Sequence, residues 1–319
     1  IYTLLAGAIV LGLGAFGASV LNAPVERELV DQLGTVWLWR QEAPAVPVAN
    51  GERCPDVPRI DYVRTTALEL PDPQSASYEI NPALYETFKK GQFSVRTLHI
   101  WGVYSDIGCK EPLGWGTAFL VGQYKSVQIW ETVEHNVKTS KYFNSTFGRV
   151  IATNWFIQDS DGNFKELLFV GCQEDKACTL VSSYIDMTSP ISLDDDVITN
   201  DVALLEPTYA YGCTVVGETI KRWVHYKLHF FCLGNAGIVH SRDQIVSLVG
   251  GDLLVSNPAM PGFSGSPLFV WRDNRLLVVG TINAGVEGVF TAVNFILPET
   301  VTKMKAWLRE GEQLFIESH

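Results

Sequence analysis

The chain has 319 residues, of which 47% are hydrophobic and 18% charged, so it can bury one large core or the cores of two fused small barrels with extra segments. The formal net charge is −11 at pH 7, which argues against a nucleic-acid partner because phosphate binding needs a basic face. The sequence has no CxxC pair and no Cys/His cluster with zinc spacing, so it predicts neither a metal site nor a bound cofactor.

Residues 1–21 carry no charged side chain. At about 1.5 Å per residue they are just long enough to cross a bilayer core as a helix, and we expect a single-pass membrane anchor there. The segment contains "GLGAFG", but no strand precedes this G-x-G-x-x-G match, so its glycines are interpreted as helix-packing positions and not as a dinucleotide loop. A cleaved signal peptide is the alternative, and the segment lacks the basic start that such a peptide needs.

A juxtamembrane helix and a Pro-rich linker are predicted over residues 22–61, from the amphipathic "VERELVDQLGTVWLWRQ" and the proline-rich "EAPAVPVANGERCPDVPRID". Residues 62–94 are predicted to form an N-terminal extension that packs on the domain after it. From about Val95 the pattern changes to short β-rich runs between turn residues, which is typical of a barrel or a sandwich.

The six cysteines are an even set whose number and spread favour an oxidising compartment. Cys172 and Cys178 bracket "QEDKA" and are placed to close a small loop, while the sequence does not choose among the other pairings. A glycosylation sequon at Asn144 also points outward, whereas Arg27 and Arg40 after the anchor weakly favour the cytoplasm. We expect the β-rich domain on the extracytoplasmic side.

The stretch "PGFSGSPLFV", residues 261–270, places one serine between two glycines ahead of an apolar run. Such glycines let the backbone bend so that the N–H groups of Gly262 and Ser264 point into one small space, as an oxyanion hole requires. A tight turn without chemistry is the alternative, because small-residue turns are common. A catalytic serine would also need a base and a group that orients the base.

Two residues upstream supply these groups. His135 follows an apolar strand in "SVQIWETVEHNV", and Asp201 stands before the apolar run of "NDVALLEP". In the order His, Asp, Ser they form a candidate triad with Ser264, in which His135 takes and returns the proton and Asp201 orients and charge-stabilises the imidazole. Taken singly, the histidine is an ordinary turn residue and the aspartate an ordinary strand-start carboxylate.

These motifs together resemble the chymotrypsin-like (trypsin-fold) serine proteases. "TVEH" is similar to the family's T-A-x-H turn, "NDVALLEP" to N-D-I-A-L-L, and "GFSGSPLFV" to G-D-S-G-G-P-L-V. "GVFTAV" followed by "VTKMKAWL" is similar to the family's G-V-Y-T-x-V strand and closing helix. The resemblance covers roughly residues 95–310. It implies an all-β fold of two antiparallel six-stranded barrels with the active site between them, followed by a C-terminal helix.

The resemblance also implies domain boundaries and a substrate pocket. The first barrel, with the histidine and the aspartate, is expected over residues 95–205, the second, with the serine and the pocket, over 206–297, and the C-terminal helix and tail over 298–319. The pocket is expected from Pro258, Asn283, Ala284, Gly285, Gly288 and Phe290. No carboxylate stands among them and glycines lie on both walls, so cleavage of a protein or peptide after a medium or large apolar residue is expected.

The sequence departs from the family at several positions. Phe263 stands where zymogen-activated members carry an aspartate, so activation by a new N-terminus is not expected. Val133 and Glu134 replace the small residues that usually precede the histidine. The intervals between the triad residues are more similar to viral and bacterial members than to digestive ones. Asp186 and the acidic run at residues 194–196 are alternatives for the carboxylate.

The sequence thus predicts a membrane-anchored serine endopeptidase. The first alternative is a catalytically idle scaffold subunit, in a membrane complex or virion whose partner packs on the anchor; decayed relatives, however, usually lose a triad residue. The second is a membrane-anchored protease-chaperone. Such proteins carry a peptide-binding domain after the barrels, and the residues after Phe295 here are too few for one.

Overall fold

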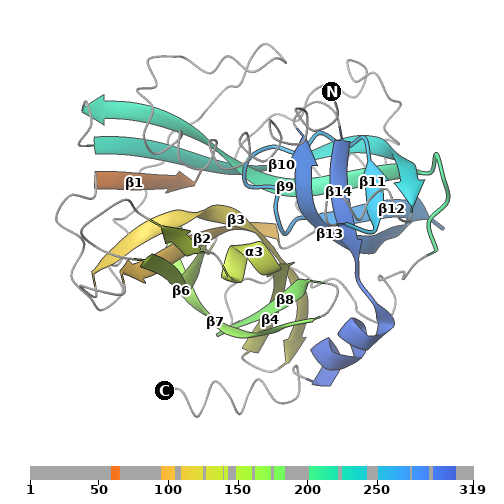
Figure 1. Ribbon diagram of the computed structural model, residues 1–319, viewed down its shortest axis with the longest axis horizontal. Helices are drawn as coiled ribbons and strands as arrows, with labels where there is room; N and C mark the ends of the chain where they lie inside the picture. Colours follow the sequence, from red (N-terminus) through yellow and green to blue (C-terminus); the bar gives the residue numbers. More distant parts are fainter. Residues whose placement is uncertain are drawn as a thin grey trace.

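The computed structural model describes residues 59–64, 95–104, 109–124, 127–138, 140–142, 149–159, 162–173, 176–183, 201–221, 225–242, 251–273, 275–286 and 290–306. The expected anchor and all but the end of the expected linker lie outside these residues. Within them, no helix is both long and apolar enough to cross a bilayer. Their secondary structure is almost entirely β-strand, as the sequence predicted for the region after Val95 (Figure 1).

The first sheet is a closed barrel of six strands with a short seventh strand at its side. Antiparallel pairing runs in the order β2, β3, β4, β8, β7 and β6, and β6 pairs back to β2. The short β5 pairs with β6. The strands are β2 (Val95–Tyr104), β3 (Lys110–Tyr124), β4 (Val127–Val133), β5 (Ser140–Tyr142), β6 (Arg149–Gln158), β7 (Phe164–Cys172) and β8 (Ala177–Ser183).

The second sheet comes mainly from the later part of the chain. Antiparallel pairing runs in the order β10, β11, β14, β13, β12 and β9, and β9 also pairs along β10, so the two ends of this row are joined. The strands are β9 (Pro207–Lys221), β10 (His225–Arg242), β11 (Leu253–Val255), β12 (Pro267–Arg272), β13 (Arg275–Val286) and β14 (Phe290–Phe295).

An additional strand, β1 (Arg59–Arg64), pairs with β10 in parallel. From the sequence, these residues were expected at the end of the linker and the start of the extension, because the prolines before them suggested an extended strap. The structure instead builds them into the second sheet. Tyr62 explains the difference, since its ring is buried and stacks on Phe230 of β10 with centroids 5.6 Å apart.

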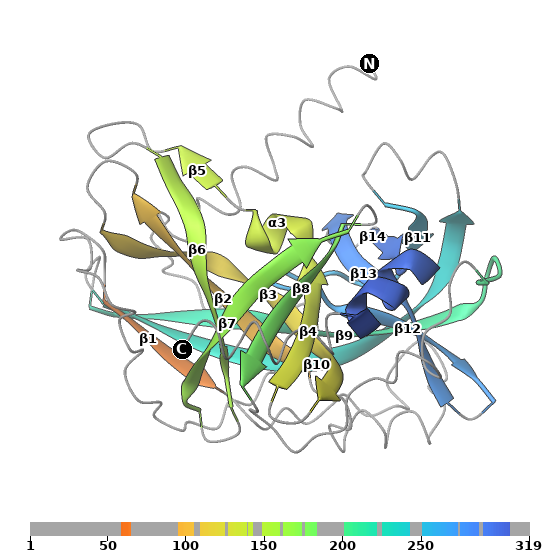
Figure 2. The same cartoon turned by 90° about the horizontal axis from the view of Figure 1, so that it is seen from below.

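The continuous apolar runs of the sequence arise because strands are buried on both faces. Along β3, Ala118 and Leu120 point into the core of the first barrel, whereas Phe119 and Val121 belong to a cluster shared with the second sheet. Side chains that alternate between two apolar environments give a run without polar interruptions. The sheets are therefore packed on each other, and α3 (Glu134–Val137) lies where the first sheet meets β13 and β14 in both views (Figures 1 and 2).

Disulfides join neighbouring strands. Cys172 and Cys178 are bonded, so the small loop between β7 and β8 is closed as the sequence suggested. Cys213 and Cys232 face each other in the register of β9 and β10 and are bonded as well, and Cys109 is also in a disulfide. Each of the two bonds with both cysteines described joins neighbouring strands of one sheet.

The predicted C-terminal helix is confirmed, and residues 298–306 are helical. Met304 is fully buried and Val301 packs against the same cluster, which also contains Phe119 of the first sheet and Phe269 of the second. The helix thus covers the outer side of the junction between the sheets (Figure 2).

Candidate active site

Ser264 lies on a tight turn just before β12. Gly262 and Gly265 have φ angles of +101° and +89°, which glycine adopts without strain. The N–H groups of Phe263, Gly265 and Ser266 each donate to a backbone carbonyl. Those of Gly262 and Ser264 donate to no described residue. The folding of the turn therefore leaves unused the two N–H groups that the sequence predicted for an oxyanion hole.

Gly265 has no room for a side chain. A Cβ at this position would overlap the carbonyl oxygen of Thr117, Oγ1 of Thr132 and Nδ2 of Asn136. These three residues belong to β3, β4 and α3, whereas Gly265 belongs to the second sheet. The glycine is what allows the serine turn to lie directly against the first sheet.

Hydrogen bonds across this contact hold the backbone of the turn. The carbonyl of Ser264 accepts from the N–H of Thr117 and from Nδ2 of Asn136, both at 2.8 Å. Asn136 is buried, and its Nδ2 also donates to Thr132 at 2.9 Å. Oγ1 of Thr117 donates to the carbonyl of Gly262 at 2.7 Å. The first sheet therefore fixes the backbone of Gly262 and of Ser264, the residues on either side of Phe263.

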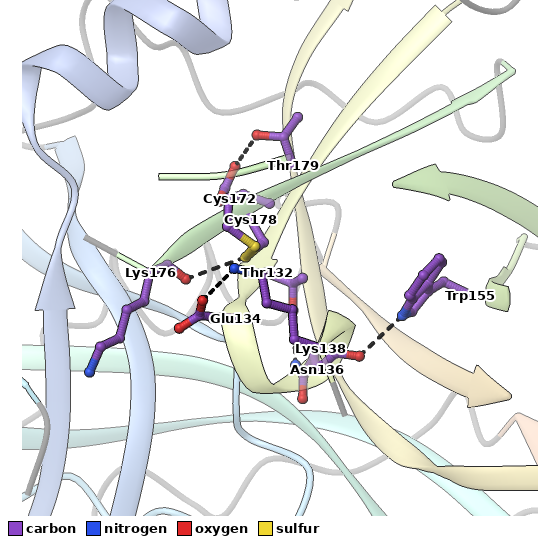
Figure 3. Close-up of a disulfide and its surroundings, with 10 residues drawn as sticks. Thr132, Glu134, Asn136, Lys138, Trp155, Cys172, Lys176, Cys178 and Thr179 are labelled. Atoms are coloured by element: carbon purple, nitrogen blue, oxygen red, sulfur yellow. Dashed lines mark hydrogen bonds and ion pairs between the residues drawn. A yellow bond between two sulfur atoms is a disulfide. The ribbon is translucent and has the colours of Figure 1, made fainter. Parts of the chain in front are cut away.

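The backbone of His135 is fixed from both sides by its neighbours in α3. The N–H of Glu134 donates to the carbonyl of Lys176 at 2.9 Å, just before β8 begins. The carbonyl of Asn136 accepts the indole N–H of Trp155 at 3.1 Å (Figure 3). Since β8 pairs with β4, which runs directly into α3, the barrel itself holds the histidine at this place.

The imidazole of His135 hydrogen-bonds to the side chain of Asn283. Although the residue reaches the surface, the protein atoms around the ring disfavour its charged form and lower the pKa of His135 below the usual value. The bond to Asn283 and the carboxylate of Glu134 act in the opposite direction, and the charge of Lys176 adds to the lowering. The ring is therefore neutral at pH 7, the form in which it can accept a proton.

The segments that carry His135 and Ser264 are joined by hydrogen bonds of their neighbouring residues where the two sheets meet. Asn283, the partner of the imidazole, follows Ile282 on β13, and the carbonyl of Ile282 accepts the N–H of Gly265 at 2.8 Å. From the first sheet, the residue after the histidine donates to the carbonyl of Ser264. The serine hydroxyl bonds to no described residue, and such a bond often tightens only when substrate is present.

Asp201 does not join this group. Its side chain is 86% exposed, and its carboxylate pairs with Nη1 of Arg272 at 2.9 Å. Arg272 ends β12 whereas Ser264 precedes it, and the strand alone spans roughly 17 Å at about 3.3 Å per residue. The assignment of Asp201 as the orienting carboxylate rests on motif order and does not fit this geometry. The alternatives, Asp186 and residues 194–196, lie outside the described residues.

Ala259 lies close to Gly285, one of the residues expected to leave room in the pocket. Of its residues, Pro258 is exposed, and those on β13 and β14 that the structure describes are partly buried; Gly288 lies outside the described residues. A Cβ on Gly285 would be 2.6 Å from the methyl group of Ala259. Gly285 does not create room on its wall, because the methyl of Ala259 already lies against it.

Asn257 holds the segment that carries Pro258 and Ala259. Its Oδ1 accepts from Thr208 at 2.6 Å, and its carbonyl accepts from Thr291 at 2.5 Å. Asn257 is 1% exposed, so both bonds are shielded from water. The segment is therefore held rigidly against β9 and β14.

Phe263 and Val133, two departures from the family pattern, are both fully buried. Phe263 packs in the core of the second sheet, where a charged side chain would be costly. Val133 ends β4, and Glu134 after it turns outward to Lys138 at 2.6 Å. The larger residues before the histidine are accommodated because one enters the core and the other points to solvent.

No protein-family model matches the chain, and no curated protein matches it. The chemistry is therefore inferred from the residues themselves. In the part of the chain that the structure describes, no group of His, Cys, Asp or Glu side chains is arranged to hold a metal ion. What the site offers is a hydroxyl, a neutral imidazole and two unused N–H groups at one junction.

Sequence reasoning missed two residues that build the site, Thr117 and Asn136. Thr117 lies within "GWGTAFLV" and reads as an ordinary strand residue, although the glycine before it signals close packing. Gly116 has that role, since a Cβ there would overlap the side chain of Asn136. For Asn136, the available signal was that a polar residue stands directly after the histidine.

Proposed function

We propose that the protein is a membrane-anchored serine endopeptidase of the two-barrel, trypsin-like fold, with Ser264 as nucleophile and His135 as general base. The observation that carries the proposal is the bond from Asn136, the residue after the histidine, to the carbonyl of Ser264 at 2.8 Å. It ties the base-bearing helix to the serine turn. The unused N–H groups of Gly262 and Ser264 support the same function.

The reaction follows from these groups. His135 removes the hydroxyl proton as Oγ of Ser264 attacks the scissile carbonyl carbon, and the N–H groups of Gly262 and Ser264 stabilise the resulting oxyanion. As the C–N bond breaks, the proton passes from His135 to the leaving amine, and the acyl group stays on Ser264 as an ester. His135 then deprotonates a water that hydrolyses this ester, which releases the acid and returns the proton to the serine.

The substrate is proposed to carry an apolar residue on the acyl side of the cut bond, since no described pocket residue is charged. A medium or large residue was expected, but the contact between Gly285 and Ala259 favours a small one. A Cβ added to Gly285 would lie 2.6 Å from the methyl group of Ala259, so Ala259 lies close to the backbone of Gly285 and leaves little width for an aromatic ring between them. A peptide panel should show Ala preferred to Phe, and Ala259→Gly should raise the relative rate with Phe about tenfold. A wild-type preference for Phe would contradict this.

The anchor is proposed at residues 1–21, with the protease domain on the extracytoplasmic side of the membrane. The disulfides Cys172–Cys178 and Cys213–Cys232 support this side, because such bonds persist in oxidising compartments. Addition of a membrane-impermeant protease to intact vesicles of known orientation would test the topology.

A scaffold subunit of a membrane complex or virion is the second candidate function. Two observations favour it: the hydroxyl of Ser264 bonds to no described residue, and Asp201 lies with Arg272. A decayed protease would keep the fold and lose the alignment of these groups.

Labelling with a fluorophosphonate probe separates the two functions, because the probe reacts only with an activated serine. The full chain in detergent should be labelled, and both Ser264→Ala and His135→Ala should abolish labelling. Ser183→Ala is the matched control, since Ser183 is an exposed serine at the end of β8. Absence of labelling in a folded wild-type chain would favour the scaffold.

A further inference from the structure

We propose that Asn283, in place of Asp201, is the residue that positions the imidazole of His135. The inference rests on the proposed function and assigns its third group. The resemblance placed Asn283 only in the wall of the pocket, and the structure gives its side chain a hydrogen bond to His135.

The place of Asn283 in the second sheet suits this role. It follows Ile282 on β13, whose carbonyl accepts from Gly265 and whose N–H donates to Ser266, both at 2.8 Å. Both bonds are made directly after Ser264, at Gly265 and Ser266. The side chain that holds the base is therefore carried by the same backbone that holds the nucleophile, and a shift of one moves the other.

The direction proposed for the hydrogen bond is from the imidazole to the amide of Asn283. An amide side chain can offer its carbonyl oxygen to an N–H of the imidazole, and such a bond favours the charged ring, which agrees with the direction in which Asn283 acts on the pKa of His135. With one ring nitrogen committed as donor, the other keeps its lone pair for the hydroxyl of Ser264. A neutral amide orients the ring as a carboxylate would, but it gives less stabilisation to the imidazolium that forms during the reaction.

Glu134 and Asp201, the two described carboxylates considered for the orienting role, are each paired with a cation. Glu134 is adjacent in sequence, and its Oε1 pairs with Nζ of Lys138 at 2.6 Å. Asp201 is held by Arg272 at the far end of β12. Lys176 faces the ring with a positive charge, which opposes protonation. Of the described groups that act on the charge of the imidazole, Asn283 is the one that does so through a side-chain hydrogen bond.

The test compares Asn283→Ala, Asn283→Asp and Asp201→Asn in hydrolysis of a peptide ester, with kcat and KM measured from pH 5 to 9. Asn283→Ala should lower kcat about 100-fold with little change in KM or in thermal midpoint, because the base loses its orientation. Asn283→Asp should keep activity and move the acid limb of kcat/KM to higher pH by about one unit or more, since a carboxylate favours the charged ring. Asp201→Asn should stay within about twofold of wild type.

Equal losses in Asp201→Asn and Asn283→Ala would overturn the inference. Full activity of Asn283→Ala together with loss of activity in Asp175→Asn would also overturn it. That result would assign the orienting role to the acidic pair that precedes Lys176 in the sequence. If the wild-type chain is inactive, the proposed function fails, and nitrogen NMR of His135 still decides the inference. The ring should hold a single tautomer in wild type and a mixture in Asn283→Ala; an unchanged spectrum would refute it.

Discussion

The two ends of β12 are built in opposite ways. Before the strand, the Ser264 turn is packed on the first sheet, with glycines at its close contacts and uncharged hydrogen bonds of 2.7 to 2.8 Å from Thr117 and Asn136. After the strand, Arg272 forms ion pairs with Glu206 and Asp201, and the Asp201 side chain is 86% exposed. The end with Ser264 depends on close packing and buried hydrogen bonds. The end with Arg272 depends on charged groups near water.

This difference shows at which end of β12 the residues are held most tightly in position. Buried hydrogen bonds lose their full value when one partner is removed, because the other is left unsatisfied away from water. Exposed ion pairs are screened and contribute little. Precise placement of a nucleophile and a base is expected at the first end, and tolerance of substitution at the second.

The largest effect is expected from Gly265→Ala. Gly265 has a φ of +89°, and a Cβ would overlap the carbonyl of Thr117, so both strain and a clash with backbone arise. A loss of about 3 kcal/mol or more in the free energy of unfolding is expected, together with loss of probe labelling. Gly162→Ala is the matched control, because Gly162 has a φ of +84° with no atom within 4 Å of the added Cβ. It should cost about 1 kcal/mol. Equal losses in urea unfolding would show that packing at the serine turn is unimportant.

The second-largest effect is expected from Asn136→Ala. It removes a buried donor to the carbonyl of Ser264 and leaves a cavity beside Gly116, at a cost of about 2 kcal/mol and a fall of labelling rate of tenfold or more. Asn154→Ala is the control, since the amide of Asn154 bonds to Glu166 at the surface and should cost less than about half a kcal/mol. If both variants unfold at the same urea concentration, the cross-sheet bond does not hold the site.

Much of the fold, and both residues of the proposed catalytic pair, could be predicted from the sequence. Short β-rich runs between turn residues predicted a β-rich body after Val95, and the glycines around Ser264 predicted a turn whose N–H groups point into one small space. His135 was found because it follows an apolar strand. These signals are local, and the physical cause of each lies within a few residues.

Asp201 shows why the remainder was not accessible. The apolar run after it looked like a barrel strand, but Leu204 and Leu205 are 60% and 69% exposed and β9 begins only at Pro207. The strand position next to β4 is filled by β8, which comes earlier in the chain. A run of apolar residues in the sequence does not distinguish a buried strand from an exposed connection. Likewise, the bond between His135 and Asn283 depends on the packing of two sheets, which no local pattern encodes.

Between pH 6.5 and pH 5 the pH dependence of stability should come from the interior and not from the ionic end of β12. His99 is buried, both ring nitrogens lack a hydrogen-bond partner among the described residues, and its ring contacts are with Tyr62, Phe164 and Phe230. Burial lowers the pKa of His99 to about 3. Between pH 6.5 and that value the unfolded chain binds a proton that the folded chain excludes, so stability falls as the pH falls.

A loss of about 2 kcal/mol is expected between pH 6.5 and pH 5 in urea unfolding. His99→Phe should flatten this slope, because the phenyl ring fits the same aromatic surroundings and does not titrate. His135→Ala is the control that accounts for the smaller contribution of the other histidine with a lowered pKa. An equally steep slope in His99→Phe would assign the effect to another group.

The smallest effect is expected from Arg272→Met, which removes every ion pair at the far end of β12 and keeps the apolar length of the side chain. Arg272 binds Glu206 through Nε and Nη2, both at 2.8 Å, and Glu206 is 15% exposed. Burial raises the pKa of Glu206, but the bonds from Arg272 and from the N–H of Ala203 outweigh it and lower the pKa overall. The pair therefore stabilises the fold above about pH 4.5 and loses this effect as the pH falls further.

Because Glu206 is only partly shielded and Asp201 is exposed, the loss should be about 1 kcal/mol at low salt and smaller in 1 M NaCl. The labelling rate of Ser264 should change less than about twofold, since the strand and not the ion pairs carries the serine turn. Asp201→Ala should cost less still, because its pairing with Arg272 is open to water. A large fall in labelling with either variant would show that the two ends of β12 are coupled, and would return Asp201 to the catalytic group.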